Sequence, residues 1–165
     1  MSMPIVLVRV DERLVHGQVL EGWIPSTRAQ ELWIANDVLA ADSVQRTIME
    51  SAIPFSVRLI IDTVEKIAAL LRDEDEGEIR RMILVDAPED ALRLRRAGVR
   101  FDSLNLGNLR KNDFSVCLSN SVLVGDDTLS TLRDIMDEGV RINIQSVPFE
   151  KPVDLFDAFR RCPRT

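Results

Sequence analysis

Short apolar runs rich in β-branched residues alternate along this chain with segments of helical periodicity, and this alternation restricts the possible folds more than any other feature. It is typical of βαβ units, in which helices connect the strands of a largely parallel sheet. Several runs are almost continuously apolar, as expected for strands covered on both faces. We predict strands at residues 5–10, 32–35, 57–61, 82–85, 103–106 and 140–145, with an antiparallel or edge strand near residues 122–124.

Capping residues and apolar periodicity predict where the intervening helices begin and end. The charged run at residues 73–78 lacks an apolar anchor and is expected to be a solvated connection. The expected helices are one capped by Asn36 or Asp37 that runs through residues 44 and 48 until Pro54, one that begins at the capping-box variant of residues 62–65, one between Pro88 and Gly98, one between Asp126 and Gly139, and a short one holding residues 155–159.

The length of 165 residues and the hydrophobic content of 45% suit one compact domain spanning residues 1–165. The expected fold class is α/β, a single-domain open sheet, mostly parallel, with helices on both faces and room for one antiparallel edge strand. The 21 basic and 27 acidic residues give a net charge of −6, which argues against binding to nucleic acid or anionic membranes. No apolar run approaches a membrane span and no signal segment opens the chain, so we expect a cytoplasmic protein.

The cysteines and the single histidine argue against a metal site. Cys117 and Cys162 lie too far apart in sequence to indicate a disulfide scaffold or a zinc site. We expect Cys117 to be a small core residue and Cys162 to belong to the tail. Neither a metal nor a cofactor is expected. Trp23 and Trp33 are interpreted as core or sheet-packing residues rather than a platform for a sugar.

The histidine, His16, directly follows the first predicted strand and precedes a predicted helix that starts near Gly17. A loop between a strand and a helix lies at the carboxyl edge of an α/β sheet, where ligands bind. Unpaired amide groups of the first helical turn attract an anion, and we expect Arg9 and Arg13 to strengthen that attraction. Gly17 would let the anion approach closely. The loop therefore predicts a phosphate site.

An imidazole beside such a site can take a phosphoryl group on a ring nitrogen, provided that a hydrogen-bond acceptor holds the proton on the other nitrogen. Asp11 is the nearest candidate for this orienting role. Arginine and backbone donors would stabilise the charge of the transferred group. From the pattern alone, a histidine with structural hydrogen bonds and arginines that are plain surface charges remain alternatives.

The segment Arg9-Val10-Asp11-Glu12-Arg13-Leu14-Val15-His16-Gly17-Gln18-Val19, followed by Trp23, strongly resembles the active-site segment of one protein family. The family is the enzyme IIB component of the mannose/fructose/sorbose class of the bacterial sugar phosphotransferase system. The likeness continues in the family's order at residues 35–42, 104–107, 122–127, 139 and 145–148, and so covers nearly the whole chain.

This resemblance implies a phosphocarrier, a protein-Nπ-phosphohistidine–sugar phosphotransferase, with an open and mostly parallel α/β fold. His16 would accept a phosphoryl group on Nδ1 from a phosphohistidine of the IIA component and pass it to a sugar brought in by the membrane components IIC and IID. Arg13 would help to neutralise that group. Arg9, Asp11, Gly17 and Gln18 match the motif as phosphate-binding or orienting residues. The permease would bring the cytoplasmic chain to the inner face of the membrane.

The chain departs from the family where Gly107-Asn108 replaces two consecutive glycines, which alters how closely that loop approaches the site; a simple turn is the alternative interpretation.

Three other functions are considered: a regulatory phosphorelay protein without transport, a binding module without transfer, and a receiver-like domain phosphorylated on Asp86 or Asp37. As helix-capping acids, those two aspartates need no such role. The rim that meets the partner is expected to carry Arg9 and Arg13. Arg110 and Lys111 are further candidates there, although ordinary turn charge is the favoured interpretation of these two.

Overall fold

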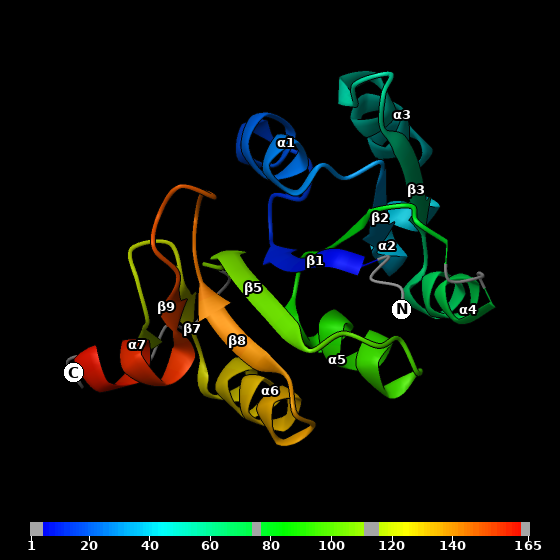
Figure 1. Ribbon diagram of the computed structural model, residues 1–165. Helices are drawn as coiled ribbons and strands as arrows, with labels where there is room; N and C mark the ends of the chain where they lie inside the picture. The colour runs from blue at the N-terminus through cyan, green and yellow to red at the C-terminus, as the bar shows by residue number, and fades with distance from the viewer. Residues whose placement is uncertain (1–4, 74–76, 111–115, 163–165) are drawn as a thin grey trace.

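The computed structural model describes residues 5–73, 77–110 and 116–162, and their central feature is a seven-stranded sheet. The strand order is β3-β2-β4-β1-β5-β8-β9, and every neighbouring pair is parallel except β8 and β9. The sheet is therefore open and mostly parallel, with an antiparallel edge, as predicted (Figure 1). Its strands are β1 (Ile5–Asp11), β2 (Glu31–Ala35), β3 (Arg58–Asp62), β4 (Arg81–Val85), β5 (Ser103–Asn108), β8 (Arg141–Ile144) and β9 (Val153–Asp154).

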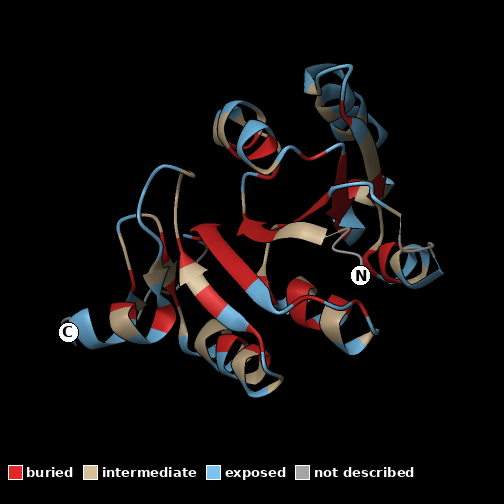
Figure 2. Cartoon of the chain, viewed as in Figure 1, coloured by how far each residue is buried: buried red, intermediate tan, exposed pale blue. Residues whose placement is uncertain are grey.

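Helices cover both faces of this sheet, because side chains in its central strands alternate between two apolar cores. In β2, Trp33 packs into one core and Ile34 into the other. The core around Trp33 is covered by α4 (Val64–Asp73), α5 (Pro88–Arg96), α6 (Asp126–Asp137) and α7 (Leu155–Arg161). The core around Ile34 is covered by the π-helix η1 (Gln18–Trp23), α1 (Ile24–Thr27), α2 (Asp37–Ala41) and α3 (Ser43–Ala52). Figure 2 shows the buried strands between these layers.

The helix expected between Asn36 and Pro54 is two helices, so that prediction was wrong in its continuity. The backbone leaves the helical region at Asp42, with φ −100° and ψ 94°. The carboxylate of Asp42 then accepts a hydrogen bond from the amide of Gln45 and caps α3. Aspartate competes with a continuing helix in this way because its short side chain can satisfy free amides of a new one. The first cap is Asn36, whose side chain accepts from the amide of Leu39.

The predicted strand near residues 122–124 exists, but it belongs to a separate hairpin. β7 (Leu123–Val124) pairs antiparallel with β6 (Val116–Cys117), whereas the antiparallel edge of the main sheet is β9. Cys117 is exposed in this surface hairpin, so its placement in the core was wrong. Residues 74–76 of the expected solvated connection lie outside the described residues, and residues 77–80 carry neither helix nor strand.

The carboxyl ends of β1, β5 and β8 meet at one edge of the sheet, where the chain turns to different sides after β1 and after β4. Such switch points are where open α/β sheets bind ligands. The indole Nε1 of Trp23 donates to the carbonyl oxygen of Ser146 at 3.0 Å, which joins η1 to the loop after β8. The segment after β1, which holds His16, leads from this edge of the sheet to η1 and α1 (Figure 1).

Candidate functional site

The loop that follows β1 holds His16 in a backbone conformation that bulky residues rarely adopt. Leu14 has φ 55°, in the left-handed region, although its side chain is buried in the core under η1. Its amide donates to the carbonyl oxygen of Asp11 at 2.9 Å. A left-handed non-glycine residue costs about 1–3 kcal/mol, and such residues gather at functional sites. Burial of the leucine side chain helps to hold the loop in this shape.

Asp11 is the centre of the site, since its carboxylate lies within hydrogen-bond distance of three basic side chains. Nη2 of Arg9 lies 3.0 Å and Nε2 of His16 lies 2.9 Å from Oδ2, while Nε of Arg13 lies 3.1 Å from Oδ1. Burial alone would raise the pKa of Asp11, but hydrogen bonds from His16 and Arg13 and the charges of His16 and Arg9 lower it to about 2. Asp11 is therefore a permanent buried anion.

The hydrogen bonds of His16 distinguish its two ring nitrogens. The ionised Asp11 can only accept, so Nε2 of His16 carries the proton in that bond. Nδ1 in turn accepts from the backbone amide of Gln18 at 3.3 Å. The side chain is 15% exposed, so solvent reaches part of the ring. In this arrangement Nδ1 is the unprotonated nitrogen of the imidazole, and its lone pair faces the amide of Gln18.

Arg13 and Gln18 form the solvent side of the site. The Arg13 side chain is 42% exposed and also donates from Nη2 to Oε1 of Gln18 at 2.8 Å. Gly17 lies in open space, where an added Cβ would meet nothing within 4 Å. The helix predicted to start near Gly17 does begin there, but its first turns are π-helical rather than α-helical. Arg13, Gly17 and Gln18 thus lie around His16 on the side of the site that faces solvent.

Arg9 occupies a different place from the one predicted. It was expected at the rim as a donor to a bound phosphate, but it is completely buried, so that prediction was wrong. Its guanidinium donates to the side chain of Asn105 and to the carbonyl oxygens of Gln145 and Ser146 at 2.8 and 3.0 Å. Buried guanidinium groups need such partners because an unpaired charge in the interior is very costly. Arg9 is placed to orient Asp11 from the interior of the protein.

The family model described as "PTS system sorbose subfamily IIB component" matches residues 5–163 of the chain. The chain belongs to this IIB family. An N-acetylgalactosamine-specific IIB component of Escherichia coli is 33% identical over 92% of this chain and 96% of its own length. A fructose-specific EIIB component of Bacillus subtilis is 28% identical over 96% of this chain and 97% of its own length.

Solved structures of IIB components share the fold of this IIB chain. The IIB domain of the sorbose permease from Klebsiella pneumoniae has a TM-score of 0.88 and is 28% identical, with 96% of this chain and 97% of that chain covered. The resemblance inferred from the His16 segment is therefore confirmed over almost the entire chain. No helix among the described residues is long and apolar enough to cross a membrane. Within the same residues, no cluster of side chains has a composition suited to a metal ion.

Sequence reasoning missed a second set of contacts that supports the loop of the IIB chain. The carboxylate of Glu12 accepts from the side-chain amide of Asn108 at 2.9 Å and from the backbone amide of Arg110 at 3.0 Å. The backbone amide of Glu12 donates to the carbonyl oxygen of Asn108 at 3.0 Å. Asn108, noted only as a departure from the family, thus anchors the His16 loop to β5.

The structure also shows where the other residues singled out in the sequence lie. Arg110 is exposed beside this anchor, and Lys111 lies outside the described residues. Trp23 and Trp33 are buried, which confirms them as packing residues. Asp37 accepts from the amide of Val64 at the start of α4 and pairs with Arg93, so it is a capping acid. These hydrogen bonds lower the pKa of Asp37.

Proposed function

We propose that this chain is a phosphocarrier in which Nδ1 of His16 accepts a phosphoryl group from a phosphohistidine of a IIA protein. It then passes the group to a sugar supplied by membrane components IIC and IID, as a protein-Nπ-phosphohistidine–sugar phosphotransferase. One observation carries the proposal: the carboxylate of buried Asp11 lies 2.9 Å from Nε2 of His16. This contact favours a proton on Nε2, which would leave Nδ1 as the nucleophile. Neither a metal nor a cofactor has a part in this scheme.

In the transfer step, the lone pair of Nδ1 forms a bond to phosphorus while the bond from phosphorus to the donor nitrogen breaks. The Nε2 proton stays on His16, so the ring becomes positively charged as the phosphoryl group arrives. Asp11 lies 2.9 Å from Nε2 and stabilises this charge in a buried setting. In the onward step, the sugar hydroxyl oxygen forms a bond to phosphorus while the bond from phosphorus to Nδ1 breaks. The hydroxyl proton leaves to water, and His16 returns to its neutral form with the proton still on Nε2.

Arg13 and the backbone amide of Gln18 are the groups that would meet the phosphoryl oxygens. The Gln18 amide already donates to Nδ1. The half-exposed guanidinium of Arg13 would rotate from Asp11 and Gln18 toward the phosphoryl group. Arginine suits this role because its planar donors match phosphate oxygens. Gly17, with open space around it, would permit the donor protein to approach.

The partner surface would include Arg13 and Arg110, two exposed cations at the rim of a chain whose net charge is −6. Local positive charge of this kind favours an acidic or phosphorylated partner. The relatives' names include fructose, sorbose and N-acetylgalactosamine, so a sugar or an amino sugar is the proposed final acceptor. The site of action would be the cytoplasm, at the inner face of a permease.

The deciding experiment is incubation with a phosphorylated IIA donor, followed by intact mass spectrometry and linkage analysis. We expect one phosphoryl group, stable in alkali, whose phosphorus–nitrogen NMR coupling identifies Nδ1. His16→Ala should abolish the label. Asp37→Asn and Asp86→Asn serve as matched variants for a receiver-like domain. An alkali-labile label that survives His16→Ala and is lost in one of them would replace the proposal.

Transfer onward separates transport from a regulatory relay. Membrane vesicles that contain IIC and IID should deliver the label from His16 to a sugar, and the His16→Ala variant should block sugar phosphorylation. A protein that takes the label from IIA but never releases it to any sugar in such vesicles would be a regulatory carrier. A protein that binds IIA without taking the label would be a binding module.

A further inference from the structure

The two cysteines of the chain, separated by 45 positions in sequence, lie side by side in the fold. The thiol of Cys162, directly after α7, donates to the backbone carbonyl oxygen of Cys117 in β6 at 2.7 Å. Cys117 is exposed, and its own thiol donates to the carbonyl oxygen of Ser119 at 3.3 Å. Cys117 is therefore exposed and Cys162 partly buried, and the two lie on neighbouring elements outside the site around His16.

We propose that Cys117 and Cys162 form an intramolecular disulfide when the protein meets an oxidised low-molecular-weight thiol such as glutathione disulfide. The contact between the Cys162 sulfur and the Cys117 carbonyl, added to standard bond lengths, keeps the two Cα atoms within about 8 Å. Disulfides need Cα separations of about 4.4–6.8 Å. The proposal requires that a movement of Cys162 and rotation of both side chains bring the two sulfur atoms into bonding distance.

The reaction proceeds by two thiol–disulfide exchanges. The thiolate of the exposed Cys117 attacks glutathione disulfide, forms a mixed disulfide and releases one glutathione thiolate. The thiolate of Cys162 then attacks the Cys117 sulfur, forms the protein disulfide and releases the second glutathione. The protein loses two thiol protons and two electrons, which the oxidant takes up. An excess of reduced thiol reverses both steps.

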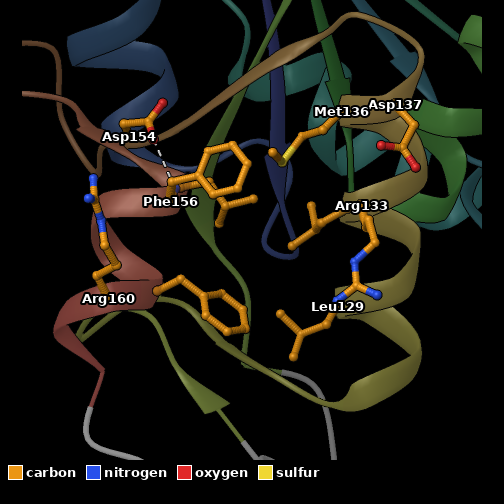
Figure 3. Close-up of a pocket in the computed structure, with 10 residues that line it drawn as sticks. Leu129, Arg133, Met136, Asp137, Asp154, Phe156 and Arg160 are labelled. Atoms are coloured by element: carbon orange, nitrogen blue, oxygen red, sulfur yellow. Dashed lines mark hydrogen bonds between the residues drawn. The ribbon is translucent and has the colours of Figure 1, made fainter.

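The bond would close a covalent ring from residue 117 to residue 162. The ring contains α6, the Gln145–Ser146 turn that receives the hydrogen bonds of Arg9, and α7. It also encloses both walls of an apolar groove of about 760 Å³, in which Leu129 and Met136 of α6 lie opposite Phe156 of α7 (Figure 3). Phe159 of α7 lines the same groove. The disulfide would hold the end of α7 against the β6–β7 hairpin. It would therefore restrict the movement of α7, which forms one wall of the groove.

The test treats the native protein with glutathione disulfide and maps the product without reduction. We expect a mass lower by about two hydrogens and a tryptic product in which residues 112–133 are joined to residues 162–164. The Tm should rise by several degrees on oxidation, because a disulfide restricts the unfolded chain. Dithiothreitol should return both the mass and the Tm to their starting values.

Cys117→Ser and Cys162→Ser are the matched controls. Each variant should fold with an unchanged circular dichroism spectrum, gain one glutathione on its remaining cysteine, and show no oxidative rise in Tm. If the native protein gains two glutathiones, forms only dimers linked between chains, or keeps both thiols open to alkylation, the proposal is overturned. If either single variant still shows the mass loss of two hydrogens, the assigned pair is wrong.

Discussion

Gly107 leaves the space in which the guanidinium of Arg9 lies: a Cβ added at position 107 would overlap that group. Arg9 is completely buried and holds β1, β5 and the turn after β8 together through its hydrogen bonds. The glycine in β5 therefore acts on the site indirectly, through Arg9 and then Asp11. Glycine inside a strand often marks such a close approach.

Substitution Gly107→Ala should displace Arg9 and loosen the support of Asp11. We expect a loss of about 1–3 kcal/mol in the free energy of unfolding, measured by urea denaturation, because overpacking of a closed interior costs this much. Phosphoryl transfer from IIA should slow as well. Gly17→Ala is the matched control, since its Cβ meets nothing within 4 Å, and it should change stability by under about 0.5 kcal/mol. Equal stability of the two variants would contradict the Arg9 packing argument.

Asp11→Asn should remove both the buried anion and the control of the His16 proton. The pKa of Asp11 is lowered from 3.8 to about 2, so its ionisation stabilises the fold above about pH 4, and this contribution disappears as the pH falls toward 2. That difference corresponds to about 2 kcal/mol. The variant should therefore lose the part of the acid dependence of unfolding that lies between these pH values.

The same variant should slow phosphoryl transfer by roughly 10²–10⁴-fold, since an amide no longer fixes the reactive tautomer of the imidazole. Asp134→Asn is the control, because this half-exposed carboxylate only lies 3.7 Å from Arg96 on the surface. Asp134→Asn should leave unchanged both the transfer rate and the loss of stability at acid pH. Unchanged transfer in Asp11→Asn would remove Asp11 from the mechanism.

Arg13→Ala should affect transfer far more than stability. The side chain is 42% exposed but its partner Asp11 is buried, so removal of the arginine should cost about 1 kcal/mol through the lost hydrogen bonds. The loss of a charged donor to the phosphoryl group should reduce the rate of transfer by roughly 10²-fold. Arg133→Ala, which removes an exposed arginine from α6, should leave the rate unchanged. Similar transfer rates for the two variants would show that Arg13 has no part in phosphoryl transfer.

Asn108→Ala should release the carboxylate of Glu12 from one of its partners. We expect a loss of about 1 kcal/mol in stability and a several-fold slower transfer, because the His16 loop loses an anchor to β5. Asn120→Ala removes an exposed asparagine of the β6–β7 hairpin and serves as the control. A double-mutant cycle with Glu12→Gln should show coupling between positions 12 and 108. Additive effects would rule out the proposed anchor.

Much of the fold could be predicted from local patterns. The apolar runs located the parallel strands, because a strand covered on both faces must be apolar along its length. The break between α2 and α3 was missed, because Asp42 reads equally well as a helix residue or as a cap until the packing of both helices is known. The strand near residues 122–124 was predicted as antiparallel or edge, but its pairing with β6 in a separate hairpin was not predicted, since pairing depends on contacts distant in sequence.

The candidate site likewise has features that neighbouring residues predict and features that depend on contacts distant in sequence. The sequence by itself determined that His16 follows a strand, that Asp11 and Arg13 stand in the same loop, and that the segment belongs to a known family, because these are properties of neighbouring residues. Only the tertiary structure decided that Arg9 is buried, that Gly107 makes room for it, that Asn108 holds Glu12, and that Cys162 reaches Cys117. Each of these depends on which strands and helices meet, and such long-range contacts form only when the whole sheet assembles.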